Sequence, residues 1–158
     1  MRLAILTNIL TPYRMRFYNE LNTQLRFMNG ELRVYVMTDE LPLRPWTYED
    51  LKESFTQLIP GKKILVRGMD FIYNPSITRE IKRFLPDIVI IAGSWTYPTV
   101  WKLLCSKRNN NVRYFFWVES HERRAMKAKS SNKCVSAFKK YLYPNLPKKL
   151  YTTSSLML

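Results

Sequence analysis

The chain has 158 residues, with 26 Lys and Arg against 12 Asp and Glu, and a formal net charge of +14 at neutral pH. This length suits one domain with a buried core. A content of 46% hydrophobic and 24% charged residues excludes wholesale disorder and collagen-like or coiled-coil chains. The charge indicates an anionic partner, which is nucleic acid, anionic lipid or a phosphorylated small molecule.

Targeting signals and metal ligands are both scarce. The best uncharged apolar run, 88–92, has five residues, whereas a membrane span needs about 18 such residues. The first apolar run is interrupted by Asn8 and Pro12 and has no small-residue cleavage site, so we expect no signal peptide and a cytoplasmic location. There are only two cysteines, Cys105 in a predicted helix and Cys134 in a basic polar stretch, which favours reduced thiols over a disulfide framework. With a single His, we expect no metal site.

The first third of the chain predicts strand, helix and strand. Residues 3–6 form a short apolar run without polar alternation, which is typical of a buried strand. A helix is predicted over about 13–28 and ends near Asn29-Gly30. The apolar face of this helix would carry Phe17, Leu21, Leu25 and Met28. The next strand is predicted at 32–37.

The following segment predicts one short helix and one strand. Residues 41–46 contain two prolines and cannot be regular. Thr47, with Asp50 three residues later, can cap a helix that we expect to continue through Gln57. Residues 63–66 are predicted to be the third strand of the sheet.

Residues 74–153 predict three further helix–strand units. Asn74-Pro75 can start a helix whose apolar face carries Ile77, Ile81, Phe84 and Leu85, and Pro86-Asp87 ends it. The β-branched run 88–91 predicts a strand covered on both faces. The other predicted elements are a helix over 97–104, a strand over 112–118, a helix over 136–143 and a strand over 150–153.

Alternation of strands and helices predicts an α/β domain with a mainly parallel sheet of roughly six strands, covered by helices on both faces and joined by right-handed crossovers. In such sheets ligands bind beyond the carboxyl ends of the strands. The candidate loops are therefore 7–14, 38–46, 93–97 and 119–124.

The loop after the first strand combines several binding groups. Asn8, Thr11, Tyr13 and Arg14 offer an amide, a hydroxyl, a ring and a guanidinium at a helix start, where free N–H groups favour anions. Only four glycines are present and none forms a phosphate-binding motif, so we expect no nucleotide cofactor in this domain. The alternative is a capped turn with Tyr and Arg on the surface.

Two other loops carry candidate groups. Glu119 and His121 follow the aromatic strand, where His suits proton transfer or a hydrogen bond to a sugar hydroxyl, and Glu can orient or deprotonate a hydroxyl. A solvated charged turn is the alternative. Trp95 adds a ring that can stack on a sugar or an acyl chain, or that instead belongs to the core or to a lid.

The segment 123–149 has nine basic residues and no acidic one. These are Arg123, Arg124, Lys127, Lys129, Lys133, Lys139, Lys140, Lys148 and Lys149. Tyr141 and Tyr143 lie among them, so the segment predicts contact with an anionic membrane, for which Arg123, Arg124, Lys127, Lys139 and Lys140 are the candidates. The alternative is a solvated basic loop and helix.

Several motifs together resemble one enzyme family. They are Thr7-Asn8, Thr11-Pro12-Tyr13-Arg14 with Phe17 and Asn19-Glu20-Leu21, the run 86–93 (PDIVIIAG), and Trp117-Val118-Glu119-Ser120-His121. In this order and spacing the chain resembles the N-terminal half of a family 4 glycosyltransferase of the GT-B fold. Members have two Rossmann-like domains, the first binding the acceptor and the second the nucleotide-sugar, and they retain the anomeric configuration.

The resemblance implies a Rossmann-like three-layer α/β/α domain over 1–158, with the nucleotide-sugar domain absent. It implies acceptor contacts from Asn8, Thr11, Tyr13 and Arg14, and a catalytic or donor-sugar role for Glu119 or His121. The expected partners are that second domain, a glycolipid or saccharide acceptor, and the inner face of the plasma membrane. This fragment alone should be inactive. Rival hypotheses are a basic nucleic-acid-binding α/β domain, which no RRM, helix-turn-helix or KH signature supports, and a non-catalytic membrane adaptor.

Overall fold

The computed structural model describes residues 1–39, 45–66, 69–93, 97–106, 112–118 and 150–154. Strands β1 (Arg2–Thr7), β2 (Glu31–Val36), β3 (Thr56–Leu58), β6 (Ile88–Ala92), β7 (Arg113–Val118) and β8 (Leu150–Ser154) form one sheet. All neighbours pair in parallel, in the order β3-β2-β1-β6-β7-β8. The predicted α/β class and the parallel sheet of six strands are confirmed.

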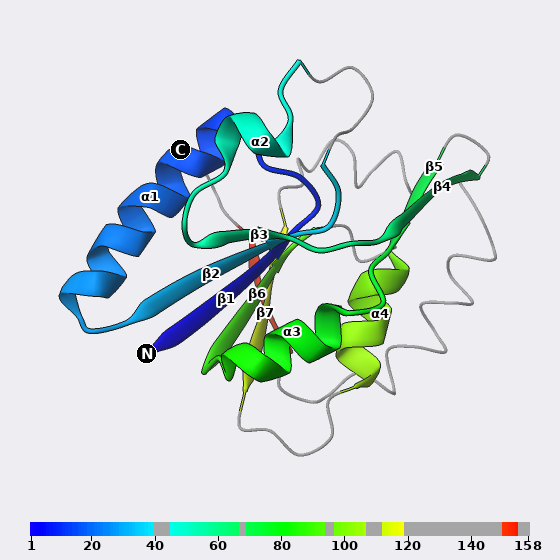
Figure 1. Ribbon diagram of the computed structural model, residues 1–158. Helices are drawn as coiled ribbons and strands as arrows, with labels where there is room; N and C mark the ends of the chain where they lie inside the picture. The colour runs from blue at the N-terminus through cyan, green and yellow to red at the C-terminus, as the bar shows by residue number, and fades with distance from the viewer. Residues whose placement is uncertain (40–44, 67–68, 94–96, 107–111, 119–149, 155–158) are drawn as a thin grey trace.

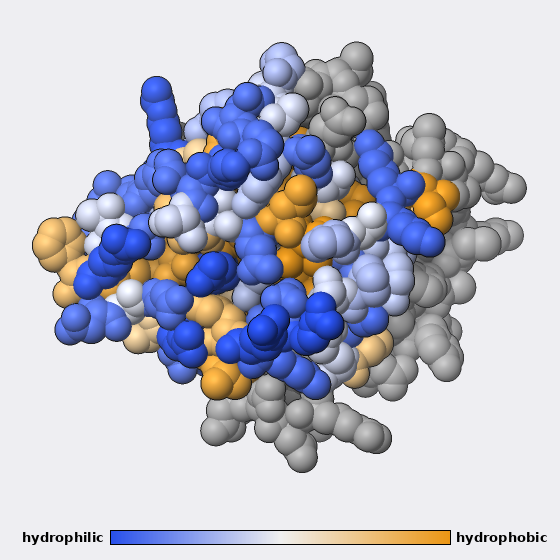
Figure 2. Space-filling view, viewed as in Figure 1, coloured by the Kyte–Doolittle hydropathy of each residue, from blue (hydrophilic) through white to orange (hydrophobic). Residues whose placement is uncertain are grey.

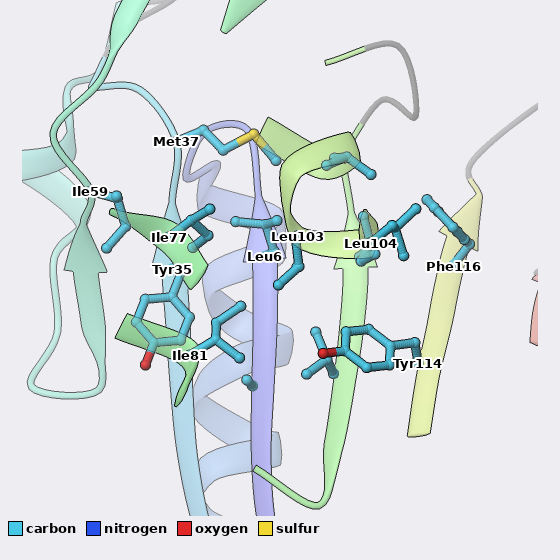
Figure 3. Packing of buried hydrophobic residues seen from close by; sticks show 14 of the residues in the cluster. Leu6, Tyr35, Met37, Ile59, Ile77, Ile81, Leu103, Leu104, Tyr114 and Phe116 are labelled. Atoms are coloured by element: carbon cyan, nitrogen blue, oxygen red, sulfur yellow. The ribbon is translucent and has the colours of Figure 1, made fainter. Parts of the chain in front are cut away.

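Helices cover both faces of this sheet (Figure 1). Helix α1 (Pro12–Phe27) lies on one side, and α3 (Ile77–Phe84) and α4 (Pro98–Cys105) lie on the other. Alternate residues of β1 serve the two layers: Leu3 and Ile5 pack in the cluster with α1, whereas Ala4 and Leu6 pack in the cluster with α3 and α4 (Figure 3). A strand buried on both faces has no polar alternation, which explains the continuous apolar run.

The chain builds the sheet outward from β1 in two directions. It adds β2 and then β3 on one side of β1, and later adds β6, β7 and β8 on the other. The direction of winding therefore reverses between β1 and β6, and this is the doubly wound, Rossmann-like arrangement. At such a reversal the loops that leave the two central strands diverge and open a crevice at the carboxyl edge of the sheet.

The predicted helix over 13–28 is confirmed as α1, but its predicted apolar face is partly wrong. The side chains that α1 buries are Met15, Tyr18 and Leu25, whereas Phe17 is 48% and Met28 64% exposed. Positions 15, 18 and 25 lie on one stripe of the helix, and this stripe includes the Tyr18 ring. Phe17 lies outside the stripe, at the edge of the α1 layer.

The segment after β2 holds a shorter helix and an extra strand. Helix α2 covers only Tyr48–Leu51, and the predicted continuation through Gln57 is wrong because Lys52 is extended, with φ −66° and ψ 144°. The predicted cap is confirmed: the Asp50 carboxylate accepts hydrogen bonds from the Thr47 backbone N–H and hydroxyl, at 2.7 and 2.9 Å. These bonds lower the pKa of Asp50. Most of the predicted irregular stretch 41–46 lies outside the described residues.

The predicted third strand exists but does not join the main sheet. It is β4 (Lys62–Val66), which pairs antiparallel with β5 (Met69–Tyr73) in a separate two-stranded hairpin. The edge position in the main sheet belongs to β3, which the sequence did not predict. Gly61 lets the chain pass Asn74 at the hairpin base, since a Cβ there would lie 2.2 Å from the Asn74 amide nitrogen.

The helix predicted after Asn74-Pro75 is confirmed as α3, with Ile77, Ile81 and Phe84 buried. Asn74 is not its cap, because the N-cap position is Ser76 and the Asn74 side chain is fully buried. Leu85 does not belong to the apolar face. It is the C-cap, in the left-handed region with φ 50°, and is 68% exposed.

The predictions for β6, α4, β7 and β8 are confirmed, with Pro98 at the start of α4. The helix predicted over 136–143 lies outside the described residues. Beneath α3 and α4, the core joins Leu6, Ile91 and Phe116 from the sheet to helix residues such as Leu103 (Figure 3). Burial in this layer raises the pKa of Tyr35 to about 12 and also raises the pKa of Tyr114.

Candidate functional site

The candidate site lies where the winding of the sheet reverses. Thr7 and Ala92 are the last residues of β1 and β6 and are register partners. The loop after β1 is fixed by its neighbours, since Met37 and Thr38 donate backbone hydrogen bonds to the carbonyls of Thr7 and Asn8, both at 3.0 Å. The Trp46 indole N–H also donates to the Leu10 carbonyl, at 2.9 Å. The loop therefore leaves the sheet in a defined path.

Arg14 joins the ends of the two central strands. Its Nη1 donates to the Thr7 hydroxyl at 2.9 Å and to the Ala92 carbonyl oxygen at 3.3 Å. The Thr7 hydroxyl in turn donates to the Ile9 carbonyl, at 3.2 Å. Pro12 at the first helical position starts α1 so that Arg14 lies in its first turn, facing the β1–β6 edge.

Aromatic rings surround this guanidinium. Its central carbon lies 5.7 Å from the centroid of the Tyr13 ring and 5.8 Å from that of Trp117, near the end of β7. Trp117 also packs edge-on against Phe17 of α1, with centroids 5.2 Å apart. A guanidinium within about 6 Å of a ring is attracted to its electron-rich face, so the Arg14 side chain and the rings fix one another.

The rings in this cluster are open to solvent. Tyr13 is 59% and Phe17 48% exposed. Exposed rings beside a held cation and a half-buried amide, Asn8, can stack on an apolar ligand face and hydrogen-bond to hydroxyl or anionic groups on the same ligand. Such a surface suits a saccharide or an anionic, partly apolar molecule.

The structure brings together three of the four residues predicted as binding groups in the first loop. Asn8, Tyr13 and Arg14 lie together at the carboxyl edge, at or near the surface. Thr11 is the N-cap of α1 and is only 4% exposed. Its hydroxyl is buried and has no hydrogen-bond partner among the residues that the structure describes, so Thr11 would reach a ligand only after a local rearrangement. The direct contact expected of Thr11 stays a prediction.

The other predicted site residues lie outside the described residues, and their roles stay predictions. They are Trp95, Glu119, His121, Arg123, Arg124, Lys127, Lys139 and Lys140. Of the loop 93–97, Gly93 is described, and a Cβ there would lie 2.9 Å from the Met37 Cε and 3.7 Å from the Asn8 nitrogen. A small residue at position 93 thus permits the close approach of the loops that follow β1, β2 and β6.

Sequence reasoning missed two members of the cluster, Trp117 and Phe17. The sequence predicts Trp117 only as part of an aromatic strand and Phe17 only as part of the core face of the first helix. The available signal was strand alternation. Tyr114 and Phe116 pack on the α3–α4 side, so Trp117 must lie on the α1 side, where Phe17 approaches it.

A second polar cluster lies near the same edge of the sheet. Asn74 and Thr99 are both fully buried. The Asn74 side-chain amide donates to the carbonyls of Met37 and Ile59, at 2.8 and 2.7 Å. The Thr99 hydroxyl accepts from the Asn74 backbone N–H at 2.9 Å and lies within hydrogen-bond distance of the Ile72 carbonyl and the Asn74 side-chain oxygen. We call this pair the Asn74–Thr99 knot. It ties the loops after β2 and β3 to β5 and α4.

Basic side chains gather on the outer surface of α3, where Figure 2 shows strongly hydrophilic residues. A shallow depression there is lined by Pro75, Thr78, Arg79, Lys82 and Arg83. Two of these cations already pair with Glu80, Arg79 at 3.3 Å and Arg83 at 3.9 Å. Among the residues that the structure describes, no group of three or more His, Cys, Asp and Glu is placed to hold a metal ion, and no helix is long and apolar enough to cross a membrane.

The fold and the cluster of groups around Arg14 define a doubly wound α/β domain with a candidate ligand site at its winding reversal. No protein family, curated protein or solved structure matches the chain.

Proposed function

We propose that this chain is the acceptor-binding half of a retaining glycosyltransferase, which transfers a sugar from a nucleotide-sugar to a polysaccharide or glycolipid acceptor at the inner membrane surface. The observation that carries the proposal is the cluster of Tyr13, Arg14, Phe17 and Trp117 at the winding reversal. Ligands of doubly wound sheets bind at this place, and the sequence resemblance assigns acceptor contacts to the same loop.

The chemistry of each group fits an acceptor. The exposed Tyr13 and Phe17 rings would stack on the C–H faces of a sugar or on a lipid chain. The Asn8 amide and the Arg14 guanidinium would hydrogen-bond to hydroxyl or phosphate oxygens. For transfer, the acceptor hydroxyl oxygen bonds to the anomeric carbon as the diphosphate leaves, and the hydroxyl proton goes to a base. Glu119 and His121 are our candidates for the catalytic positions.

The donor would be held by a second domain. Transfer needs donor and acceptor at bonding distance and stabilisation of the leaving diphosphate. The 158-residue sequence contains no glycine-rich phosphate loop. We therefore expect the chain alone to bind a nucleotide-sugar more weakly than about 1 mM, by calorimetry, and to transfer no sugar. Turnover by the purified chain that is abolished in His121→Ala would contradict this division.

The acceptor site can be tested on the chain as it is. An array of oligosaccharides and glycolipids should capture the wild-type chain on a subset of glycans, and Tyr13→Ala should lower this capture about tenfold, because the most exposed ring of the cluster is lost. Phe27→Ala is the matched control, since Phe27 is 80% exposed at the far end of α1. Capture of no glycan, or equal capture of the two variants, would contradict the acceptor site.

A nucleic-acid-binding domain is the alternative, and the net charge of +14 with the basic surface of α3 favours it. Binding to duplex DNA or RNA should then weaken steeply with salt, as counterion release requires. Lys82→Ala and Arg83→Ala should reduce the slope of log affinity against log salt by about one each. Affinity for glycans without such a salt slope would exclude this alternative.

A further inference from the structure

The β4–β5 hairpin carries an exposed apolar face. Its register places Lys62 opposite Tyr73 and Ile64 opposite Phe71, and directly opposed residues of an antiparallel pair share a face. Ile64 is 56% and Tyr73 39% exposed, and Phe71 is half-buried. The alternate face holds Ile72, which is 1% exposed and belongs to the main core. One face of the hairpin therefore packs inward at its base while the other is presented to solvent.

The hairpin has little support of its own in water. It has two strands and does not pair with the main sheet, and an isolated two-stranded hairpin is marginally stable in water. It departs from the carboxyl side of the sheet, next to α4 (Figure 1). Its base, in contrast, is rigid, because Ile72 and Asn74 bond to Thr99 of α4. A rigid base under an exposed apolar face is suited to pressing that face against another surface.

Basic groups border the apolar face. Lys62 is exposed at the start of β4, opposite Tyr73 on this face. The Lys102 ammonium of α4 donates to the Tyr73 hydroxyl at 3.2 Å and lies 5.3 Å from the centroid of its ring. In Figure 2 apolar and hydrophilic side chains lie side by side over the hairpin. Aliphatic and aromatic side chains flanked by Lys and Tyr match the boundary between lipid headgroups and acyl chains.

We infer that the β4–β5 hairpin docks on an anionic lipid bilayer, with Ile64 and Phe71 at the acyl boundary and Lys62 and Lys102 at headgroup phosphates. Charge decides between occupants. A second copy would bring the same lysines to this face and carries the same net charge of +14, so the two copies would repel each other, whereas an anionic bilayer neutralises the lysines and covers the apolar side chains together. Two lysines beside an apolar face do not form the continuous basic groove that nucleic acid requires.

This surface is distinct from the basic segment 123–149, and lipid binding by the hairpin can be measured in a chain without transferase activity. The inference therefore goes beyond sugar transfer. A chain that binds lipid but no glycan would contradict only the acceptor-binding role, and a chain that binds glycan but no lipid would contradict this inference and the membrane location but not the acceptor-binding role.

Vesicle cosedimentation tests the inference. The 158-residue chain should bind vesicles of phosphatidylglycerol and phosphatidylcholine at low salt, and bind pure phosphatidylcholine at least tenfold more weakly. Ile64→Ser should lower the affinity for anionic vesicles about tenfold, from the loss of apolar burial. Lys62→Ala should lower it about fivefold. Phe27→Ser, which removes an equally exposed ring far from the hairpin, should bind like wild type.

A labelled chain gives a second readout. With Cys105 and Cys134 replaced by Ser, an environment-sensitive dye on Ile64→Cys should shift to shorter emission wavelengths with anionic vesicles, and a dye on Phe27→Cys should not. Equal vesicle binding by wild type and Ile64→Ser, or binding by neither, would overturn the inference. Self-association without vesicles that is lost in Ile64→Ser would assign the face to a second copy and would also overturn it.

Discussion

Two polar clusters lie near the carboxyl edge of the sheet, and they differ in how their hydrogen-bonding groups are used. In the Asn74–Thr99 knot both side chains are fully buried, and the Asn74 amide is bonded to two backbone carbonyls. The Arg14 cluster consists of Asn8, Tyr13, Arg14, Phe17 and Trp117 at the winding reversal; here, by contrast, Tyr13 and Phe17 are about half exposed and Asn8 is half-buried. The knot holds loops together, whereas the Arg14 cluster presents groups to solvent. The polar residues at this edge are thus of two kinds: those whose side chains hold the fold together by hydrogen bonds, and those whose side chains are accessible to a ligand.

The division has a geometric cause. The knot lies where the loops after β2 and β3 meet the base of the hairpin and the start of α4, and this side of the sheet edge is closed by chain. The Arg14 cluster lies at the ends of β1 and β6, where the winding of the sheet reverses. Variants of the knot should therefore lose stability, and variants of the cluster should lose binding with little change in stability.

Asn74→Ala should give the largest loss of stability. It leaves the Met37 and Ile59 carbonyls without their partner and opens a cavity in a fully buried place. We expect a decrease of about 3 kcal/mol in the free energy of unfolding, measured by urea denaturation. A loss below about 1 kcal/mol would show that the knot does not hold the loops and would remove the contrast with the Arg14 cluster.

Thr99→Val keeps the shape of the side chain and removes its hydroxyl, which the Asn74 backbone N–H uses as acceptor. We expect a loss of about 1.5 kcal/mol in the same urea experiment. The double variant with Asn74→Ala should be less destabilised than the sum of the two, by about 1 kcal/mol, because the two residues share hydrogen bonds. Strict additivity would mean that they act as separate contacts.

Tyr35 extends the comparison to pH. It is buried on the same side as the knot, and burial raises the pKa of its hydroxyl from 10.0 to about 12. Above pH 10 the unfolded chain loses this proton while the folded chain keeps it, so stability should fall as the pH rises from 10 to 12. The melting temperature of Tyr35→Phe should fall less over this range. An equal decrease in melting temperature for wild type and Tyr35→Phe between pH 10 and 12 would show that Tyr35 does not contribute to the pH dependence of stability.

Much of this fold follows from the sequence because its central elements are locally determined. The strand around Ile5, the β-branched run 88–91 and the Pro98 helix start each have one signal that no tertiary contact overrides. The failures concern long-range choices. Nothing local to 62–66 tells whether a strand joins the main sheet or pairs with 69–73, since pairing depends on which edge is free.

The candidate site was predictable in part, for the same reason. Asn8, Tyr13 and Arg14 all lie in the segment that directly follows the first strand, so the edge rule alone brings them together. Trp117 reaches them from another strand, 103 positions beyond Arg14 by sequence number, and only the strand order β1-β6-β7 makes it a neighbour. Asn74 shows the opposite error. Its sequence matched a helix cap, but burial and two carbonyl partners gave it a different role.

Asn8→Ala should give the smallest change in stability and is the sharpest counterpart of Asn74→Ala. Both changes remove one side-chain amide at the carboxyl edge, but the amide of Asn8 holds no backbone carbonyl in the part of the chain that the structure describes. The Asn8 backbone carbonyl keeps its bond to Thr38 in the variant. We expect the free energy of unfolding to change by less than about 0.5 kcal/mol, while capture on glycans that bind wild type falls several-fold. A loss of stability like that of Asn74→Ala, with glycan capture unchanged, would place Asn8 among the residues whose side chains hold the fold together. The acceptor site would then rest on the rings and Arg14 alone.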